Sequence, residues 1–392
     1  MSAEPAQVSP AGEGVAASIY DLAVVGGGPA GCAAAWTAAR AGLRVLQYEP
    51  DQFPHDKVCG EFISSEAHAL LGAMVPETAQ RAVVVRHAEF VAPGGVRRRF
   101  QLPQPALGLS RLSLDAALWA AARAAGVTQH ATRVQNVEHD STGFLVRSDG
   151  VALRARAVIV AAGRWWSIAG LRSAVETAET GGPWLGVKAR FRQLERAGLT
   201  PAVEMFYFRG GYCGLAPVED GMINACCLVH RKYAGRVVEA RDFAAWMSQV
   251  GGRALRQRLR GGKQVTPTVT TAQVRTAPKH AMLGGVLLAG DAAGFLDPFT
   301  GDGLAMALRS GELAGKHVAS HLQAHLGQAA CLETTAQAYA AELRASAATS
   351  FATARWLRRI VLAPAWVQNA AAAGLLIPAV AQHLVKRTRW QG

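Results

Sequence analysis

The segment YDLAVVGGGPAGCAAAWTAARAGLRVLQYEP, residues 20–50, constrains the fold more than any other part of the chain. An apolar run leads directly into glycines, an alanine-rich stretch follows, and a second apolar run closes on Glu49. This order predicts a strand, a tight turn, a helix and a parallel strand, which together form a βαβ unit. Its turn carries the pattern G-x-G-x-x-G. In that pattern Gly26 permits the turn, Gly28 lets the backbone approach a pyrophosphate, and Gly31 lets helix and strand pack closely.

A late glycine-rich stretch, GVLLAGDAAGFLDPFTGDGLAMALRSG, decides which dinucleotide the first unit binds. Glu49 lies where an acid accepts hydrogen bonds from ribose hydroxyls, which fits FAD or NAD and disfavours NADP. No second βαβ unit accompanies the late stretch, so we expect it to complete the first site. Asp291 would accept from ribityl hydroxyls, and the helix that opens at 300–303 would stabilise negative charge on a reduced ring. The sequence therefore predicts one extended FAD held from both ends of the chain.

The overall composition narrows the function classes. The chain has 392 residues, is 50% hydrophobic and carries a formal net charge of +13. No acidic residue follows Glu342, so the basic excess gathers at the C-terminus, where Trp356, Trp390 and several arginines suggest an interfacial helix or a cap over a pocket. Charge alone does not support a nucleic-acid partner. Six cysteines without a CxxC pair predict a reduced, cytoplasmic protein, peripheral at a membrane if the tail binds lipid, and no metal site.

Interleaved segments describe the domain organisation better than two consecutive domains. We predict a disordered lead (1–19), an FAD-binding domain in three parts (20–82, 106–182 and 276–325), a substrate-domain hairpin (83–105), a β-rich substrate domain (183–275) and a helical C-terminal region (326–392). The hairpin is expected to turn at 93–95, and Ser113 is expected to cap the helix that follows. Short aromatic and β-branched runs between glycines predict an antiparallel sheet in the β-rich part.

From Tyr20 to about residue 315 the sequence resembles a family of FAD-dependent oxidoreductases that includes geranylgeranyl reductases, single-component aromatic hydroxylases and flavin halogenases. The resemblance rests on the glycine pattern, Glu49, the SRxxLD segment that begins at Ser110, the turn at 161–164 and the motif GDAAGFLDPFTGDG. It implies an α/β fold with a glutathione-reductase-like FAD-binding Rossmann domain, an interleaved antiparallel β-sheet substrate domain and a helical C-terminal region. It also implies that Arg111 contacts FAD, the alternative being an exposed arginine at a helix start. The expected FAD-binding residues are Gly26, Gly28, Pro29, Ala30, Gly31, Glu49, Cys59, Gly60, Arg111, Ala162, Gly163, Gly290, Asp291, Gly301, Asp302 and Gly303.

The segment HDKVCGEFIS resembles the KxCGE segment of the geranylgeranyl reductase subgroup, where it lies near the flavin ring. Cys59 is assigned a packing or flavin-contact role, because neither a partner nor a cause for a lowered pKa is visible in the sequence. Glu61 and His55 are candidates for a proton relay, and an exposed loop acid is the competing interpretation. Lys57 is of the residue type that halogenases use, but the W-x-W-x-I-P pattern of that class is missing at 165–168. No catalytic residue is assigned beyond these candidates.

A group of aromatic residues marks the expected substrate pocket, with the core of the sheet as the alternative role for each. They are Trp184, Phe206, Phe208, Tyr212 and Phe299, and the non-aromatic Pro298 is assigned to the same pocket.

The predicted function is that of a monooxygenase that hydroxylates a hydrophobic aromatic or polyketide-type metabolite through a flavin C4a-hydroperoxide. The alternative is a C=C reductase of the geranylgeranyl reductase type, in which flavin N5 delivers hydride to an isoprenoid or polyene and an acid supplies the proton. A flavin halogenase and a non-catalytic FAD-binding protein are less favoured. NADH or NADPH would act as a transient reductant. A separate flavin reductase or a carrier protein would be a further partner.

Overall fold

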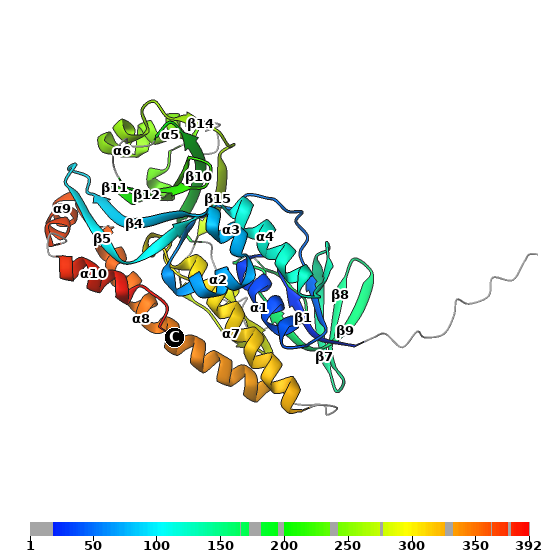
Figure 1. Cartoon of the computed structure of the whole chain (residues 1–392). Coiled ribbons are helices and arrows are strands. Elements are labelled where there is room, and N and C mark those ends of the chain that lie inside the picture. Colours follow the sequence, from blue (N-terminus) through cyan, green and yellow to red (C-terminus); the bar gives the residue numbers. More distant parts are fainter. Residues whose placement is uncertain are drawn as a thin grey trace, which may run out of the picture.

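The computed structural model describes residues 19–164, 166–171, 182–194, 200–235, 242–274, 277–325, 332–361, 363–374 and 378–391. Apart from Ile19, the predicted disordered lead lies outside the described residues. Figure 1 shows two lobes, one around β1 and β9 and the other around β10 to β13, with the long helices α7 and α8 running side by side along the first. The structure is therefore a mixed α/β fold.

The first sheet builds the glycine turn. Its strand order is β17-β18-β9-β1-β2-β6, with β8 on β9 and β7 on β8. The central strand β1 pairs in parallel with β2 and with β9, so that Val25 lies opposite Tyr48 and Val160. The carboxyl ends of these strands thus meet beside the glycine turn, where open α/β sheets bind ligands. The strands are β1 (Tyr20–Val25), β2 (Val45–Tyr48), β6 (Thr128–His130), β7 (Val134–Asp140), β8 (Gly143–Ser148), β9 (Val151–Val160), β17 (Met282–Leu283) and β18 (Val286–Leu288).

The second sheet has the order β14-β10-β13-β12-β11-β4-β5-β3, with β15 on β10. The four strands expected in the middle of the chain are confirmed as β10 to β13, and the hairpin expected at 93–95 is confirmed as β4 and β5. The hairpin joins this sheet through a parallel pairing of β4 with β11, which the sequence did not predict. The strands are β3 (Phe62–Ile63), β4 (Val83–Val91), β5 (Arg97–Gly108), β10 (Trp184–Arg192), β11 (Ala202–Phe208), β12 (Gly211–Val218), β13 (Met222–His230), β14 (Lys263–Gln264) and β15 (Val269–Val274), and a separate small pair is formed by β16 (Ala277–Pro278) and β19 (Gly294–Phe295).

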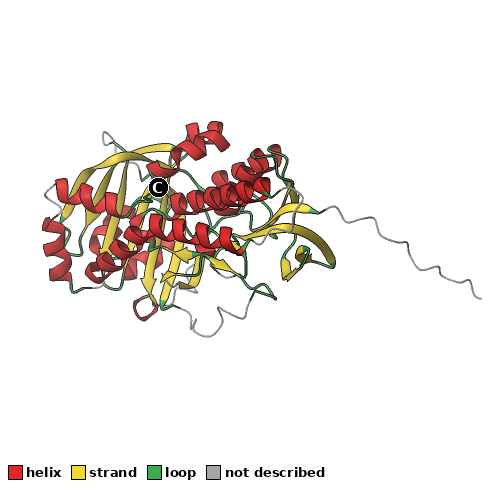
Figure 2. Cartoon of the chain, turned by 90° about the horizontal axis from the view of Figure 1, so that it is seen from below, coloured by secondary structure: helices red, strands yellow, loops and turns green. Residues whose placement is uncertain are grey.

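Helices cover the strands, and Figure 2 shows them from below, lying in front of the sheets. The helix α7 packs along α1 because its glycines allow close approach: a Cβ at Gly311 would lie 2.1 Å from the carbonyl oxygen of Ala30. The last helix, α10, contacts β5 and α8. The helices are α1 (Pro29–Arg40), α2 (His68–Met74), α3 (Pro76–Arg81), α4 (Arg111–Ala124), α5 (Phe243–Val250), α6 (Gly252–Leu259), α7 (Gly303–Ala324), α8 (Glu333–Val361), α9 (Ala365–Gly374) and α10 (Pro378–Arg387).

The N-terminus of α4 corrects one expectation. Ser110, and not Ser113, is the N-cap, because its hydroxyl accepts the backbone N–H of Ser113 at 3.2 Å. Ser113 instead donates its hydroxyl to Glu219 at 2.6 Å, and Glu219 also accepts the backbone N–H of Ser110 at 2.8 Å. The start of α4 is therefore tied to the second sheet, which fixes Arg111 between the two lobes.

Candidate functional site

The glycine turn leaves room for a ligand at one position and removes it at the others. Gly26 has φ of +122°, and a Cβ there would lie 2.3 Å from the carbonyl oxygen of Ala161. A Cβ at Gly31 would lie 2.0 Å from the carbonyl oxygen of Gly26, so helix and strand pack in direct backbone contact. A Cβ at Gly28 would meet no atom within 4 Å. The turn is therefore closed toward the protein and open at Gly28, which suits a phosphate approaching the N-terminus of α1.

Glu49 closes the other side of the turn. Its carboxylate is 6% exposed and accepts the backbone N–H of Gly27 at 2.7 Å and that of Asp51 at 3.1 Å. Each carboxylate oxygen has a second lone pair, so the group can still accept from ribose hydroxyls. These bonds hold the carboxylate in place beside the open position at Gly28.

The loop between β18 and α7 lies at the same end of the first sheet as the glycine turn. Asp291 lies there with its side chain 36% exposed, and Arg164 approaches its carboxylate at 3.9 Å. The loop is pinned to α7 by the hydroxyl of Ser310, which accepts the backbone N–H of Gly290 at 2.9 Å. Two of the expected FAD-binding glycines instead allow close packing. A Cβ added at Gly290 would lie 2.8 Å from the Cβ of Ala30, and a Cβ added at Gly301 would lie 3.0 Å from the ring of Phe62.

Three further glycines resemble Gly28. A Cβ at Gly60, Gly163 or Gly303 would meet nothing within 4 Å. These open positions come from the Cys59 loop, the turn after β9 and the start of α7. Backbone open to this extent at several glycine turns fits a long dinucleotide. Contact of Pro29, Ala30, Cys59, Gly60, Ala162 and Gly163 with FAD stays a prediction.

Asp302, the N-cap of α7, points into the protein. It is 1% exposed, accepts the hydroxyl proton of Ser64 at 2.5 Å and lies 3.7 Å from Arg389. Arg389 also donates to the carbonyl oxygen of Thr300 at 2.8 Å, so the C-terminal segment braces this turn. We therefore expect any contact between Asp302 and FAD to come from its backbone.

Burial of Asp302 gives a testable pH dependence. Burial raises the pKa of Asp302 to about 7, although Arg389 and Ser64 oppose the rise. The unfolded carboxyl ionises near pH 4, so between about pH 4 and 7 only the folded protein keeps this proton, and stability falls as pH rises through that window. The effect amounts to at most about 4 kcal/mol. We expect Asp302→Asn to flatten the dependence of Tm on pH. The control Asp220→Asn, at a side chain 56% exposed, should leave it unchanged. Equal slopes in the two variants would contradict the assignment.

Arg111 is held rigidly between the lobes and is not an exposed helix-start arginine. Its side chain is 12% exposed and donates to Asp115 at 2.7 and 2.6 Å. Burial would lower the pKa of Arg111, but Asp115 and then the neighbouring Cys59 thiol outweigh burial and raise it. A guanidinium therefore lies beside the Cys59 thiol.

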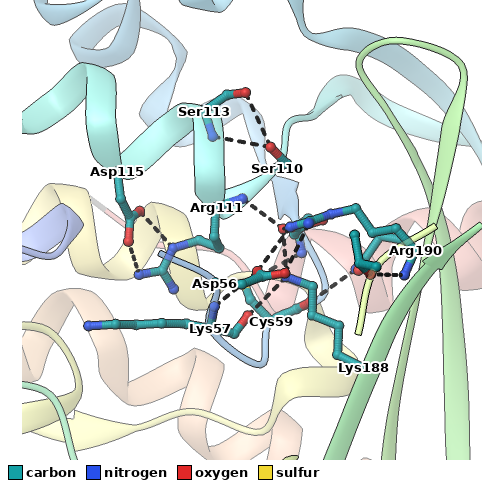
Figure 3. Close-up of polar contacts among 12 residues, drawn as sticks. Asp56, Lys57, Cys59, Ser110, Arg111, Ser113, Asp115, Lys188 and Arg190 are labelled. Carbon is teal, nitrogen blue, oxygen red and sulfur yellow. Dashed lines mark hydrogen bonds and ion pairs between the residues drawn. The ribbon is translucent and has the colours of Figure 1, made fainter. Parts of the chain in front are cut away.

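Glu61 is the centre of a buried ion cluster, whose members Lys188 and Arg190 are labelled in Figure 3. It has φ of 56°, and its side chain is 0% exposed, so the interpretation of Glu61 as an exposed loop acid is wrong. It accepts the backbone N–H of Arg111 at 2.7 Å, the ammonium of Lys188 at 2.7 Å and Nε of Arg190 at 2.9 Å. The carboxylate therefore links the start of α4 to the second sheet.

Asp56 completes the cluster as a second carboxylate. It accepts from Lys188 Nζ at 2.5 Å and from Arg190 at 2.9 and 3.0 Å. Burial would raise the pKa of Asp56, but Lys188 and then Arg190 outweigh burial and lower it. The cluster contains two cations and two carboxylates, so its charges cancel. The two cation side chains are 0% exposed, and a charge is stable in such a buried position only when an opposite charge pairs with it.

The cluster holds the segment that contains Cys59. Lys188 donates to the carbonyl oxygen of Lys57 at 3.0 Å, and Asn224 of β13 donates to that of Cys59 at 3.0 Å. The Cys59 sulfur accepts the backbone N–H of Glu61 at 3.4 Å. Cys59 and Glu61 therefore lie together, and a catalytic role for either stays a prediction.

The other two catalytic candidates lie apart from the cluster. The ring of His55 stacks on Phe53 with 4.8 Å between centroids and lies 3.7 Å from Asp51. Lys57 also approaches Asp51, at 3.8 Å, is 38% exposed and points away from Lys188 in Figure 3. Neither side chain takes part in the bonds that hold Glu61.

Lys188 and Arg190 are the functional residues that the sequence interpretation missed. They lie two positions apart in the apolar strand WLGVKARF, so they share one face of β10. Charged residues on one face of an otherwise buried strand require buried partners. That signal was present in the sequence, but nothing in it identified Asp56 and Glu61 as the partners.

The expected pocket aromatics divide between the two faces of the second sheet. Phe206 and Phe208 pack in the lobe's own core with Phe243 and Trp246 of α5, so for them the core alternative is correct. Trp184, Tyr212 and Phe299 lie together on the opposite face, with Met205, Tyr207 and Leu228. Pro298 is exposed. Because Lys188 and Asn224 also lie on that second face, it is the face that meets the Cys59 segment.

The C-terminal helices carry two exposed tryptophans. Trp356 is 52% exposed and Trp366 is 73% exposed, and Arg355 and Arg359 are exposed near Trp356 on α8. No helix in the described ranges has both the length and the apolar character needed to cross a bilayer. The contact of this region with a membrane surface stays a prediction.

Comparisons with known proteins identify the relatives and the structural neighbours of this chain. Residues 21–182 match the lycopene cyclase protein family. The chain is 30% identical over 324 residues to digeranylgeranylglycerophospholipid reductase 2 of Methanopyrus kandleri, covering 78% of each protein, and 25% identical over 328 residues to menaquinone reductase of Mycolicibacterium smegmatis, covering 76% of each. Among solved structures, the flavin-dependent brominase Bmp2 superposes with a TM-score of 0.77 at 17% identity, over 95% of this chain and 93% of that one. A geranylgeranyl bacteriochlorophyll reductase-like protein of Thermoplasma acidophilum superposes with a TM-score of 0.68 at 22% identity, over 94% and 91%.

The fold and the site define an FAD-dependent oxidoreductase. Within that class, the chain belongs to the geranylgeranyl reductase family. The finer description of its FAD domain as glutathione-reductase-like stays a prediction, as do the domain boundaries.

Proposed function

We propose that the protein is a flavin-dependent reductase that adds hydrogen across a carbon–carbon double bond of an isoprenoid or polyene. The observation that carries the proposal is the face of the second sheet opposite α5. One end of that face is apolar and aromatic, with Trp184, Met205 and Leu228, and the other end anchors the Cys59 segment through Lys188 and Asn224. A long apolar substrate would lie along the first end with a double bond near the second.

The relatives support this choice between the two reactions that the sequence left open. Their names describe reductases of a digeranylgeranyl lipid and of menaquinone. The brominase is less than 25% identical to this chain, so it supports the fold alone. Hydroxylation, the function predicted in the sequence analysis, therefore becomes the alternative outcome of the test.

Residues at the open glycine turns would hold the cofactor. Gly28 and Gly303 would admit the pyrophosphate to two helix N-termini, Glu49 would accept from the ribose, and Asp291 would accept from the ribityl chain. When bound, FAD supplies two-electron transfer as hydride, with NADH or NADPH as the proposed source of electrons.

The ion cluster would set the geometry of the reacting end. Asp56 and Glu61 fix a segment that contains Cys59, and the Arg111 guanidinium beside the thiol is itself fixed by Asp115. A site held by buried side chains on strands and a helix start keeps substrate and cofactor in register. The buried sheet face excludes water, which favours transfer to the double bond over loss to solvent.

An isotope experiment tests the proposed reaction. The holoprotein is incubated with NADH or NADPH and, in separate reactions, with geranylgeraniol and menaquinone, in ordinary water and in deuterium oxide under oxygen-18 gas. We expect products that gain hydrogen, carry solvent deuterium and contain no oxygen-18. Incorporation of oxygen-18 would support the hydroxylase instead. A flavin that no donor reduces would contradict both reactions.

A further inference from the structure

Two buried polar atoms on the apolar end of the sheet face have no hydrogen-bond partner. Tyr212 of β12 is 5% exposed, and its hydroxyl is unpaired. Asp297, in the loop before α7, is 4% exposed; its Oδ2 pairs with Nε of Arg358 from α8, and its Oδ1 is unpaired. Buried polar atoms of native proteins are nearly always paired, so two unpaired ones in one region need an explanation.

The two groups belong to one aromatic cluster. The ring of Tyr212 meets that of Phe299 edge-on, with 6.1 Å between centroids, and Phe299 lies in the same turn as Asp297. The guanidinium of Arg358 lies over the ring of Trp184 at 5.1 Å while it holds the Asp297 carboxylate. Three segments therefore converge: the sheet face, the loop before α7 and the helix α8.

The cluster also lies next to the proposed FAD loop. The carbonyl oxygen of Asp297 accepts the backbone N–H of Thr300 at 3.1 Å and its hydroxyl at 2.8 Å, so Asp297 begins the turn that leads to Gly303. A group bound between Tyr212 and Asp297 would consequently lie at the edge of the proposed substrate space and close to the cofactor.

Burial sets the protonation of these groups. Burial, assisted by the Asp297 charge, raises the pKa of Tyr212 well above its ordinary value, so the phenol stays a donor even in alkaline solution. Burial also raises the pKa of Asp297, against the opposing effects of Arg358 and of the backbone N–H of Phe299.

We propose that the Tyr212 hydroxyl and Asp297 Oδ1 bind an oxygen-bearing group of the substrate, a carbonyl or a hydroxyl attached to the apolar chain. The inference rests on the proposed function and narrows its substrate class to oxygenated isoprenoids or polyenes. Tyr212 donates to the substrate oxygen, and Asp297 accepts from it when that oxygen is a hydroxyl. By binding this oxygen, the pair determines which double bond of the substrate lies at the end of the sheet face that anchors the Cys59 segment.

The variant Tyr212→Phe tests the proposal first without any ligand. A hydroxyl that has no partner until substrate binds does not stabilise the substrate-free protein. We therefore expect the Tm of the holoprotein to stay equal or rise. A clear fall in Tm would show that the hydroxyl has a structural partner and would overturn the proposal. Tyr207→Phe is the matched control, because its ring lies 6.3 Å from that of Tyr212 and its side chain is partly exposed.

The second test compares geranylgeraniol with the hydrocarbon of the same skeleton that lacks the hydroxyl. We expect Tyr212→Phe to raise KM for the alcohol about tenfold, the value of one hydrogen bond, and to leave the hydrocarbon within about twofold. Asp297→Asn should also raise KM for the alcohol more than KM for the hydrocarbon. Wild-type protein that reduces both probes equally well would overturn the inference while the proposed reaction stands. If no reduction of either probe or of menaquinone occurs, the proposed function itself fails.

Discussion

Replacing Lys188 with methionine is expected to lower the free energy of unfolding by about 3–5 kcal/mol, because it leaves a buried carboxylate without its counter-ion. Lys188 is fully buried and bonds to Asp56, to Glu61 and to the backbone of Lys57. After the substitution, Arg190 alone would balance both acids. The measurement is chemical denaturation of the holoprotein, followed by flavin fluorescence and circular dichroism.

Two further variants show whether charge is the cause. Lys263→Met, at an exposed site in the same lobe, should change stability by no more than about 0.5 kcal/mol. The double variant Lys188→Met with Glu61→Gln removes one charge of each sign, so it should be less unstable than the sum of the two single variants. If Lys188→Met is as stable as wild type, the ion cluster does not hold the Cys59 segment.

Replacing Gly28 with valine is expected to weaken FAD binding on the order of 100-fold, about 3 kcal/mol, while the protein still folds. Gly28 has φ of −75°, which valine adopts without strain, and its Cβ would meet no protein atom within 4 Å. Only a ligand would collide with the new side chain. The measurement is FAD titration of the apoprotein, with circular dichroism and thermal unfolding as the test of folding.

Other glycines supply the comparison. Gly72→Val, at an exposed position of α2 where a Cβ also meets nothing, should leave FAD affinity unchanged. Gly31→Val should fail to fold, because its Cβ would lie 2.0 Å from a backbone oxygen. If Gly28→Val keeps wild-type affinity, the pyrophosphate does not bind at this turn.

Local patterns in the sequence predicted a large part of the fold. The first βαβ unit, the β4–β5 hairpin and the strands β10 to β13 follow from apolar periodicity and glycine turns, which act over a few residues. The closeness of Glu49 to the glycine turn also follows, because parallel neighbours place their carboxyl ends together.

Contacts between distant segments could not be predicted in this way. The pairing of Glu61 with Lys188 joins positions 127 residues apart, and no local pattern identifies which acid a buried strand cation meets. The parallel pairing of β4 with β11 is of the same kind. The division of the aromatics is different: alternation along β11 and β12 puts Phe206 and Phe208 on the face away from Tyr212, but choosing the buried face requires knowing where α5 packs.

An anaerobic single turnover tests the proposed reaction most directly. The holoprotein is reduced to completion without oxygen and is then mixed with geranylgeraniol or menaquinone, still without oxygen, while the flavin spectrum is recorded and the product is analysed by mass. The proposed reductase predicts that the flavin is reoxidised and that the substrate gains hydrogen in the absence of oxygen. A flavin that stays reduced until oxygen is admitted, with a product that then carries an oxygen atom, would contradict the proposal and identify a monooxygenase.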